Sequence, residues 1–140
     1  MKKRMLIMLA GLLLAVGSAY AQTSRQVADI PFDFMVGNKA FPAGEYTITP
    51  LGSDGATLML QNADAKREQA IMPHYVLAPE TQQESKLVFN QYGNHFYLSQ
   101  IWDQGSNQGR ELRMSNREKE EAQVAQVNHL VILAKLSKVR

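Results

Sequence analysis

The 140-residue chain contains no cysteine. This absence excludes disulfide bonds, zinc sites built on thiolates, a thiol nucleophile and a lipid-modified N-terminal cysteine. The three histidines are His74, His95 and His129, and their spacing matches neither H-x-x-x-H nor H-E-x-x-H. We therefore predict no metal ligands and no cofactor-binding residues.

Motifs for nucleophilic catalysis and for phosphate binding are also missing. No serine lies in a G-x-S-x-G elbow, and the loop 105–110 lacks the G-x-x-x-x-G-K-[ST] pattern. Asp103 and Glu111 flank this loop. In a hydrolytic enzyme, two such carboxylates would face each other across the substrate. Arg110 and Arg113 beside Glu111 favour surface ion pairing instead. We predict no catalytic residues.

The first 21 residues have the pattern of a secretory signal peptide. Three cations at 2–4 precede an apolar run over 5–16, and residues 19–21 form an Ala-x-Ala site. The run is shorter than the roughly 20 apolar residues that span a membrane. We therefore predict cleavage after residue 21 rather than an uncleaved anchor, with no transmembrane segment after cleavage.

Charge and export together argue against a nucleic-acid partner. The formal net charge of the full chain is +2, with 15 Lys and Arg against 13 Asp and Glu. Residues 1–21 contain three of the cations and no acidic residue, so their removal leaves a net charge of −1. No basic field then remains to attract nucleic acid. We expect a periplasmic or extracellular protein.

Short strands separated by turn-forming clusters are predicted over most of residues 22–140, which form a single β-rich domain. The clearest hairpin joins 87–92 to 96–102 across Gly93-Asn94, and a bulge near Ser99-Gln100 would keep the apolar residues on one face. The predicted fold class is all-β: a small sandwich or barrel of seven or eight short antiparallel strands, with one helix near the C-terminus.

That helix is predicted at about 116–126. Ser115 and Glu118 have the spacing of a capping box, in which the Ser hydroxyl accepts from the Glu N–H and the Glu carboxylate reaches back. Residues 128–137 fit either a buried strand or a continuation of the helix. Adjacent Val131 and Ile132 favour the strand.

Four stretches carry a resemblance. They are IPFDFMVG at 30–37, FPAGEYTI at 41–48, YGNHFYLSQIW at 92–102 and GREL at 109–112. Together they resemble a family of small exported bacterial β-rich proteins with no assigned activity. The resemblance implies a β-rich fold and export, and it carries over no catalytic residue.

The aromatic hairpin is the strongest candidate for function. Strand alternation directs Tyr92, Tyr97 and a neighbour, Trp102, away from the core. On the outer face of the sheet, such a row of exposed rings would stack on a polysaccharide or contact an envelope protein. Ordinary core packing and cross-strand pairing are the alternative. We predict a non-enzymatic binding or envelope structural domain. A carrier for a small apolar ligand in a barrel cavity and a hydrolytic enzyme of unknown substrate are the alternatives.

Overall fold

The structure is a computed structural model that describes residues 23–139. The predicted signal peptide at 1–21 lies outside the described residues. The described chain is mostly β, with 55% strand and one helix near the C-terminus, so the predicted all-β class with that helix is confirmed.

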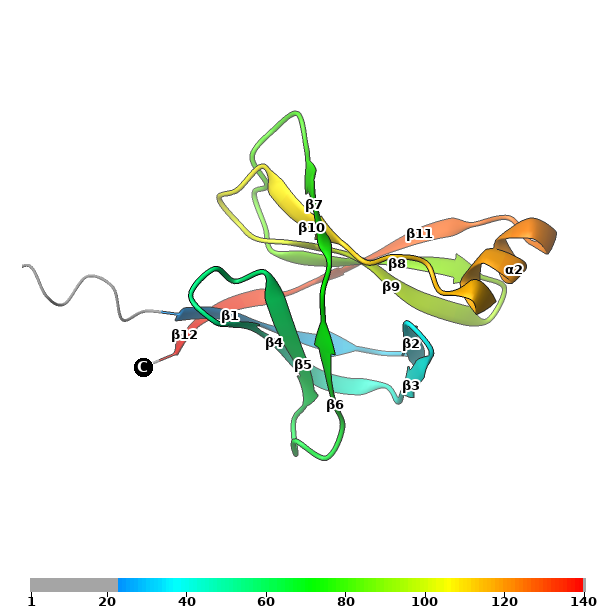
Figure 1. The fold of residues 1–140 in the computed structure, drawn as a ribbon, viewed down its shortest axis with the longest axis horizontal. Coiled ribbons are helices and arrows are strands. Elements are labelled where there is room, and N and C mark those ends of the chain that lie inside the picture. The colour runs from blue at the N-terminus through cyan, green and yellow to red at the C-terminus, as the bar shows by residue number, and fades with distance from the viewer. Residues whose placement is uncertain (1–22, 140) are drawn as a thin grey trace, which may run out of the picture.

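Two antiparallel sheets form the molecule (Figure 1). The first has five strands, in the order β12 (Lys135–Val139), β1 (Thr23–Ile30), β4 (Gly44–Leu51), β5 (Thr57–Asn62) and β6 (Glu68–Ile71). The second has seven strands, and its main path runs β11 (Asn128–Leu133), β8 (Lys86–Tyr92), β9 (His95–Trp102), β10 (Gln108–Glu111) and β7 (His74–Leu77). The small hairpin of β2 (Phe34–Val36) and β3 (Lys39–Phe41) joins it through a parallel pairing of β2 with β9.

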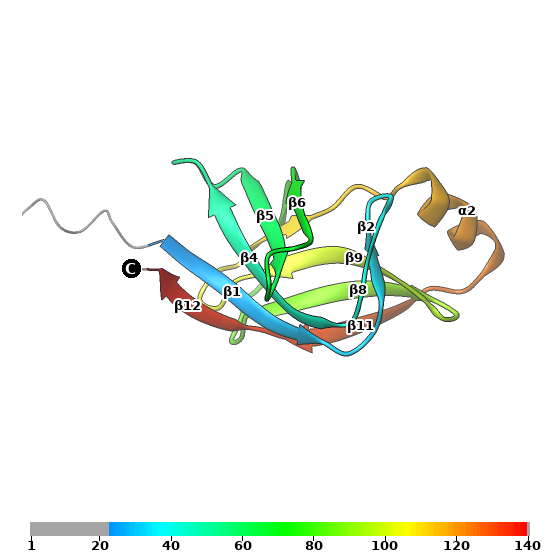
Figure 2. The ribbon, with the colours of Figure 1, turned by 90° about the horizontal axis from the view of Figure 1, so that it is seen from below.

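The chain passes between the sheets at both sides of the molecule. β6 leads into β7 through Met72-Pro73, and β11 leads into β12 through Ala134, whose N–H donates to the Ser85 carbonyl at 2.9 Å (Figures 1 and 2). The sheets nevertheless do not close into a barrel, and the arrangement is sandwich-like. Of the two predicted architectures, the sandwich is therefore correct.

The strand count exceeds the prediction, since twelve strands are present over residues 23–139. Several of the additional elements have only three or four residues, such as β2, β3 and β6. So short a segment holds at most two inward side chains, which are too few for the alternation of apolar and polar residues to identify a strand. Their pairing depends on neighbours that are distant in sequence.

The core lies between the sheets and follows strand alternation. Its largest members are aromatic, and Phe34 is in ring contact with Phe41, Tyr46 and Phe89 at centroid distances of 5.0 to 5.6 Å. The remaining buried apolar members of the core are Ala28, Ile30, Val36, Ile48, Leu58, Leu60, Ile71, Leu87, Leu98, Ile101 and Leu112.

The predicted hairpin is confirmed as β8 and β9. Gly93 adopts a φ of 60°, a conformation that glycine reaches without steric cost. Val88 pairs with Gln100 and Phe89 pairs with Leu98, so Ser99 is the extra residue of a bulge. This bulge lies where alternation requires one, and it keeps both Leu98 and Ile101 in the core.

The helix α2 runs over Asn116–Val124, two residues shorter than predicted. Ser115 caps it as predicted, because its hydroxyl accepts from the Glu118 N–H at 3.1 Å. The reciprocal half of the capping box is wrong, since the Glu118 carboxylate turns to the sheet. The segment after the helix forms β11 and β12, so 128–137 is strand rather than continued helix, but β11 is exposed or partly buried rather than buried as predicted.

Candidate functional site

The predicted row of exposed rings is absent. Tyr92, Tyr97 and Trp102 are only 5%, 2% and 7% exposed. None of the three belongs to the core cluster between the sheets, which agrees with the outward direction that alternation predicted. The prediction of exposure is wrong because other parts of the chain cover this outer face.

Helix α2 covers the two tyrosines, and Tyr92 is held to it by a hydrogen bond. The buried Glu118 Oε2 accepts from the Tyr92 hydroxyl at 3.0 Å and from Asn90 Nδ2 at 2.9 Å. Burial, and then the adjacent Glu118 carboxylate, raise the pKa of Tyr92 to about 12. Burial, and then the Glu121 carboxylate, raise the pKa of Tyr97 to about 12. Tyr92 therefore anchors the helix, whereas the buried Tyr97 hydroxyl has no hydrogen-bond partner within residues 23–139.

Trp102 is covered by its own sheet. Gly109 on β10 pairs with Trp102 on β9, and the indole lies directly over the glycine. A Cβ at position 109 would stand 2.6 Å from two ring atoms. The indole Nε1–H donates to Gln100 Oε1 at 3.0 Å, and this hydrogen bond holds the ring over Gly109.

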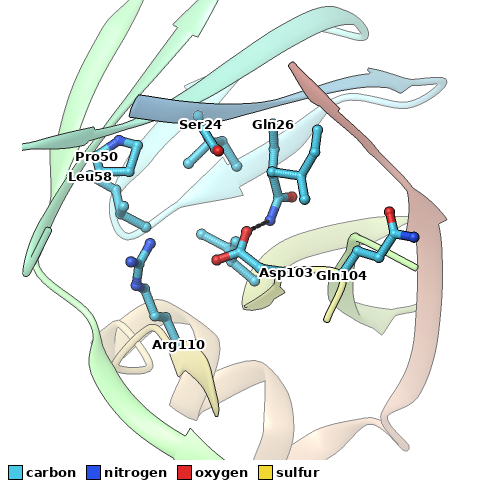
Figure 3. A pocket seen from close by; sticks show the side chains of 10 residues that line it. Ser24, Gln26, Pro50, Leu58, Asp103, Gln104 and Arg110 are labelled. Atoms are coloured by element: carbon cyan, nitrogen blue, oxygen red, sulfur yellow. Dashed lines mark hydrogen bonds between the residues drawn. The ribbon is translucent and has the colours of Figure 1, made fainter. Parts of the chain in front are cut away.

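A pocket of about 260 Å³ opens between the two sheets (Figure 3). β1, β4 and β5 supply one wall, and the end of β9, the loop after it and β10 supply the other. The lining combines apolar side chains with polar and charged ones, and consists of Ser24, Gln26, Ile48, Pro50, Leu58, Ile101, Asp103, Gln104, Arg110 and Leu136.

Gln26 is the buried polar group of this pocket, with 3% of its surface exposed. Its Nε2 donates to the Trp102 carbonyl at 2.9 Å and to Asp103 Oδ1 at 2.5 Å. Both partners are acceptors, so the amide nitrogen must face them and the amide oxygen must point elsewhere. That Oε1 is buried and has no hydrogen-bond partner within residues 23–139. A ligand donor would reach this buried atom only after the side chains around it moved aside.

Two opposite charges line the same pocket without pairing. The Asp103 carboxylate meets Gln26, while the Arg110 guanidinium reaches the pocket beside Pro50 and Leu58 (Figure 3). In the described part of the chain, no carboxylate lies within 4.0 Å of the Arg110 guanidinium. The pocket thus offers a cation, an anion and an unused acceptor around an apolar wall.

The carboxylates Asp103 and Glu111 do not share a site. Asp103 lines the pocket between the sheets, whereas Glu111 lines a groove of about 340 Å³ that also contains Asn90 and His129. Glu111 accepts from Gln100 Nε2 at 2.7 Å and lies 3.2 Å from His74 Nε2.

The predicted ion pairing of Glu111 with Arg110 and Arg113 is wrong, because the described chain pairs Glu111 with a histidine from the neighbouring strand. His95 bonds the Glu121 carboxylate, and His129 Nδ1 lies 2.9 Å from Asn90 Oδ1. Over residues 23–139, no group of three His, Asp or Glu side chains could hold a metal ion.

Sequence reasoning missed Gln26, although a signal for it exists. Gln26, Ala28 and Ile30 are two apart and all point inward from β1, while Val27 lies on the opposite face. A glutamine in the inward series of a strand is a buried polar group that needs partners.

No family model, no curated protein and no solved structure matches the chain. The resemblance to small exported β-rich proteins therefore stays a prediction. Among the described residues, the helix falls short of the length and hydropathy needed to cross a membrane.

Proposed function

We propose that the protein is an exported, non-enzymatic binding domain whose ligand occupies the pocket between the sheets. The proposed ligand is a small zwitterion with an apolar body, such as an aliphatic amino acid. The unpartnered Oε1 of Gln26 carries the proposal, because the Gln26 side chain lines the pocket that also holds the unpaired Arg110, and a ligand there lies next to this buried acceptor.

The chemistry of the three polar groups selects the ligand class. A buried acceptor without a partner destabilises the folded protein by about 1–3 kcal/mol, and a ligand donor removes that penalty. An ammonium group can donate to Gln26 Oε1 and to the Asp103 carboxylate. A carboxylate can pair with the planar guanidinium of Arg110. An apolar side chain can then lie against Ile48 and Leu58.

The size of the pocket also limits the ligand. A buried apolar cavity of roughly 150 Å³ accepts a benzene molecule, and pockets for drug-sized ligands begin near 300 Å³. A volume of about 260 Å³ therefore suits a molecule of amino-acid size. An apolar carrier would instead need an enclosed apolar cavity, whereas these sheets do not close into a barrel and the pocket is charged.

The separation of Asp103 from Glu111 also favours binding over hydrolysis. A glycosidase-type mechanism needs two carboxylates about 5 to 10 Å apart on one cleft. Here the two carboxylates line different concavities, and Glu111 is engaged by Gln100 and His74. An envelope protein or a polysaccharide as a further partner stays a prediction.

The test is a titration with L-leucine followed by amide chemical shifts. We expect saturable shifts at Gln26, Asp103 and Arg110. 4-Methylpentanoate, which is leucine without its ammonium group, and isopentylamine, which is leucine without its carboxylate, should bind more weakly. Absence of saturable shifts with all three probes would refute the proposal.

Two variants and a control locate the site. Arg110→Gln and Gln26→Leu should each weaken L-leucine binding roughly 10- to 100-fold, the range expected for hydrogen bonds to charged groups. Arg113→Gln is the matched control, because Arg113 is exposed and does not line the pocket. Equal weakening by the Arg113 and Arg110 variants would place binding elsewhere.

A further inference from the structure

The seven-stranded sheet has a second concavity, on the face that points away from the core. Asn90 is adjacent to the core residue Phe89, and Gln100 is adjacent to the core residue Ile101, so strand alternation turns both amides outward. They line the groove of about 340 Å³ that also holds Glu111. The pocket between the sheets lies on the other face of this sheet, so the two sites are separate.

The β-bulge in β9 shapes this groove. Ser99 is the extra residue of the bulge, and both Ser99 and its neighbour Gln100 line the groove. In a regular strand, two consecutive residues point to opposite faces. The Ser99 carbonyl accepts from the Leu112 N–H at 2.8 Å, which holds the chain between β10 and α2 along the groove (Figure 1). Bulges re-aim side chains in this way, and they are frequent next to active sites.

The amide of Gln100 is fixed in one orientation. The Trp102 Nε1–H can only donate, so Gln100 Oε1 faces it at 3.0 Å, and Gln100 Nε2 faces Glu111 Oε2 at 2.7 Å. His74 Nε2 lies 3.2 Å from the other carboxylate oxygen of Glu111. Within residues 23–139, the Gln100 amide nitrogen makes this one hydrogen bond, which leaves its second hydrogen for a ligand. Each Glu111 oxygen also keeps a lone pair for a further donor.

The amide of Asn90 is fixed in the same manner. The Glu118 carboxylate accepts from Asn90 Nδ2 at 2.9 Å, so Asn90 Oδ1 must face His129 Nδ1, which lies 2.9 Å away. His129 Nδ1 therefore carries a proton, and Nε2 is an acceptor when the ring is neutral. In the described chain, Asn90 Nδ2 also keeps one hydrogen for a ligand. The groove thus offers prearranged donors and acceptors, which suit hydroxyl groups because a hydroxyl both donates and accepts.

An apolar strip accompanies these polar groups. Val88 pairs with Gln100 across the strands and stands two residues from Asn90, so it has a polar neighbour in each direction. Leu112 and Met114 complete the apolar part of the lining. A pyranose ring has the matching pattern when its substituents are all equatorial. Its two faces then carry C–H groups, and its hydroxyls project from the rim.

We propose that this groove binds one ring of a neutral saccharide of the β-glucoside class. The C–H face of the ring lies on Val88 and Met114. The ring hydroxyls donate to Glu111 and accept from the amide hydrogens that Asn90 and Gln100 keep. A volume of about 340 Å³ is at the lower end of the range for ligand pockets, roughly 300–1,000 Å³, which suits a single ring.

The lining disfavours an anionic ligand and a peptide. Glu111 is a carboxylate, and among the described residues the lining contains no lysine or arginine to balance an added negative charge. An extended peptide pairs its backbone with the edge of a sheet. The floor of this groove is instead the face of a sheet, where the backbone groups of β8 and β9 are paired with each other. A neutral ring that carries several hydroxyls therefore fits best.

The first test is a titration of the full chain with methyl β-glucoside, followed by NMR shifts of backbone and side-chain amides. We expect saturable shifts at Asn90 and Gln100 and none at Gln26, where L-leucine should act, so the two proposals can fail separately. Methyl β-glucuronide differs only by a carboxylate at C6 and should bind several-fold more weakly, because Glu111 repels it. Absence of saturable shifts at the groove, or equally tight binding of the glucuronide or of capped trialanine, would overturn the proposal.

Two variants and a control assign the binding to this groove. Glu111→Gln keeps the shape of the side chain without its charge, so it should weaken glucoside binding roughly 3- to 10-fold and reduce the preference over the glucuronide. Met114→Ser removes apolar contact at a side chain that is 38% exposed, so it should weaken binding about 3-fold without disturbing the core. Glu120→Gln is the matched control, because Glu120 is exposed and does not line the groove. Unchanged binding by both groove variants, or equal weakening by the Glu120 and Glu111 variants, would exclude this site.

Discussion

Gly109→Ala tests the close packing of Trp102 against β10. Among residues 23–139, Gly109 is the one buried glycine, and it lies in an ordinary extended strand, because its φ is not positive, unlike those of Gly93 and Gly105. In a strand, replacing glycine by alanine normally stabilises a protein by about 0.4–1 kcal/mol, because the unfolded chain loses freedom. Because the Trp102 indole lies over Gly109, we expect Gly109→Ala to destabilise the protein instead.

The size of the reversal follows from the distances. An alanine Cβ would stand 2.6 Å from Trp102 Cδ2 and Cε3 and 2.7 Å from Cζ3, about 1 Å inside normal carbon contact. The ring is buried and tied to Gln100, so it cannot move freely. Overpacking of this kind costs about 1–3 kcal/mol. We expect a net loss of about 1–2 kcal/mol, which lowers Tm by roughly 4–10 °C for a domain of this size.

The assay is urea unfolding of four proteins that form a double-mutant cycle. In the Trp102→Leu background the ring is gone, so Gly109→Ala should become neutral or stabilising by up to about 1 kcal/mol. The coupling energy between the two positions should exceed roughly 1 kcal/mol. An increase in stability of Gly109→Ala in the wild-type background would refute the reasoning.

Three further predictions concern helix α2. Glu118→Ala should destabilise the protein by about 2–4 kcal/mol in urea, because the Tyr92 hydroxyl and the Asn90 amide lose their buried acceptor, whereas Glu118→Gln should cost less. Ser115→Ala should cost about 1 kcal/mol and increase amide exchange in the first helical turn. Raising the pH from 10 to 12 should weaken the fold, because unfolded tyrosines ionise near 10.0 while Tyr92 and Tyr97 ionise near 12. The stabilisation that the two tyrosines give the folded protein is complete below pH 10. Tyr92→Phe should make the loss of stability between pH 10 and 12 less steep, and an equally steep loss in that variant would contradict the prediction.

The elements with strong local signals were predictable from the sequence. The β8–β9 hairpin, its bulge at Ser99 and the Ser115 cap all depend on residues within a few positions of one another. The outward direction of Tyr92 and Tyr97 follows from alternation for the same reason. These features need no knowledge of the rest of the chain.

Coverage of a face by another element was not predictable in this way. Glu118 looks like the second half of a capping box, yet its carboxylate accepts from residues 26 and 28 positions earlier in the chain. That contact holds the helix over Tyr92, so the exposed surface that alternation alone suggested is absent. Burial depends on which distant segment crosses a sheet, and local periodicity carries no information about it.

The sequence by itself determined the β class, the helix near the C-terminus and the exclusion of thiol chemistry, because each depends on residue types or on short-range spacing. Only the tertiary structure decided where polar groups meet. It brings Gln26 to Asp103, 77 positions away, and leaves the amide oxygen unpartnered within the described chain. The packing of two sheets sets such long-range neighbours, and it thereby places the candidate site.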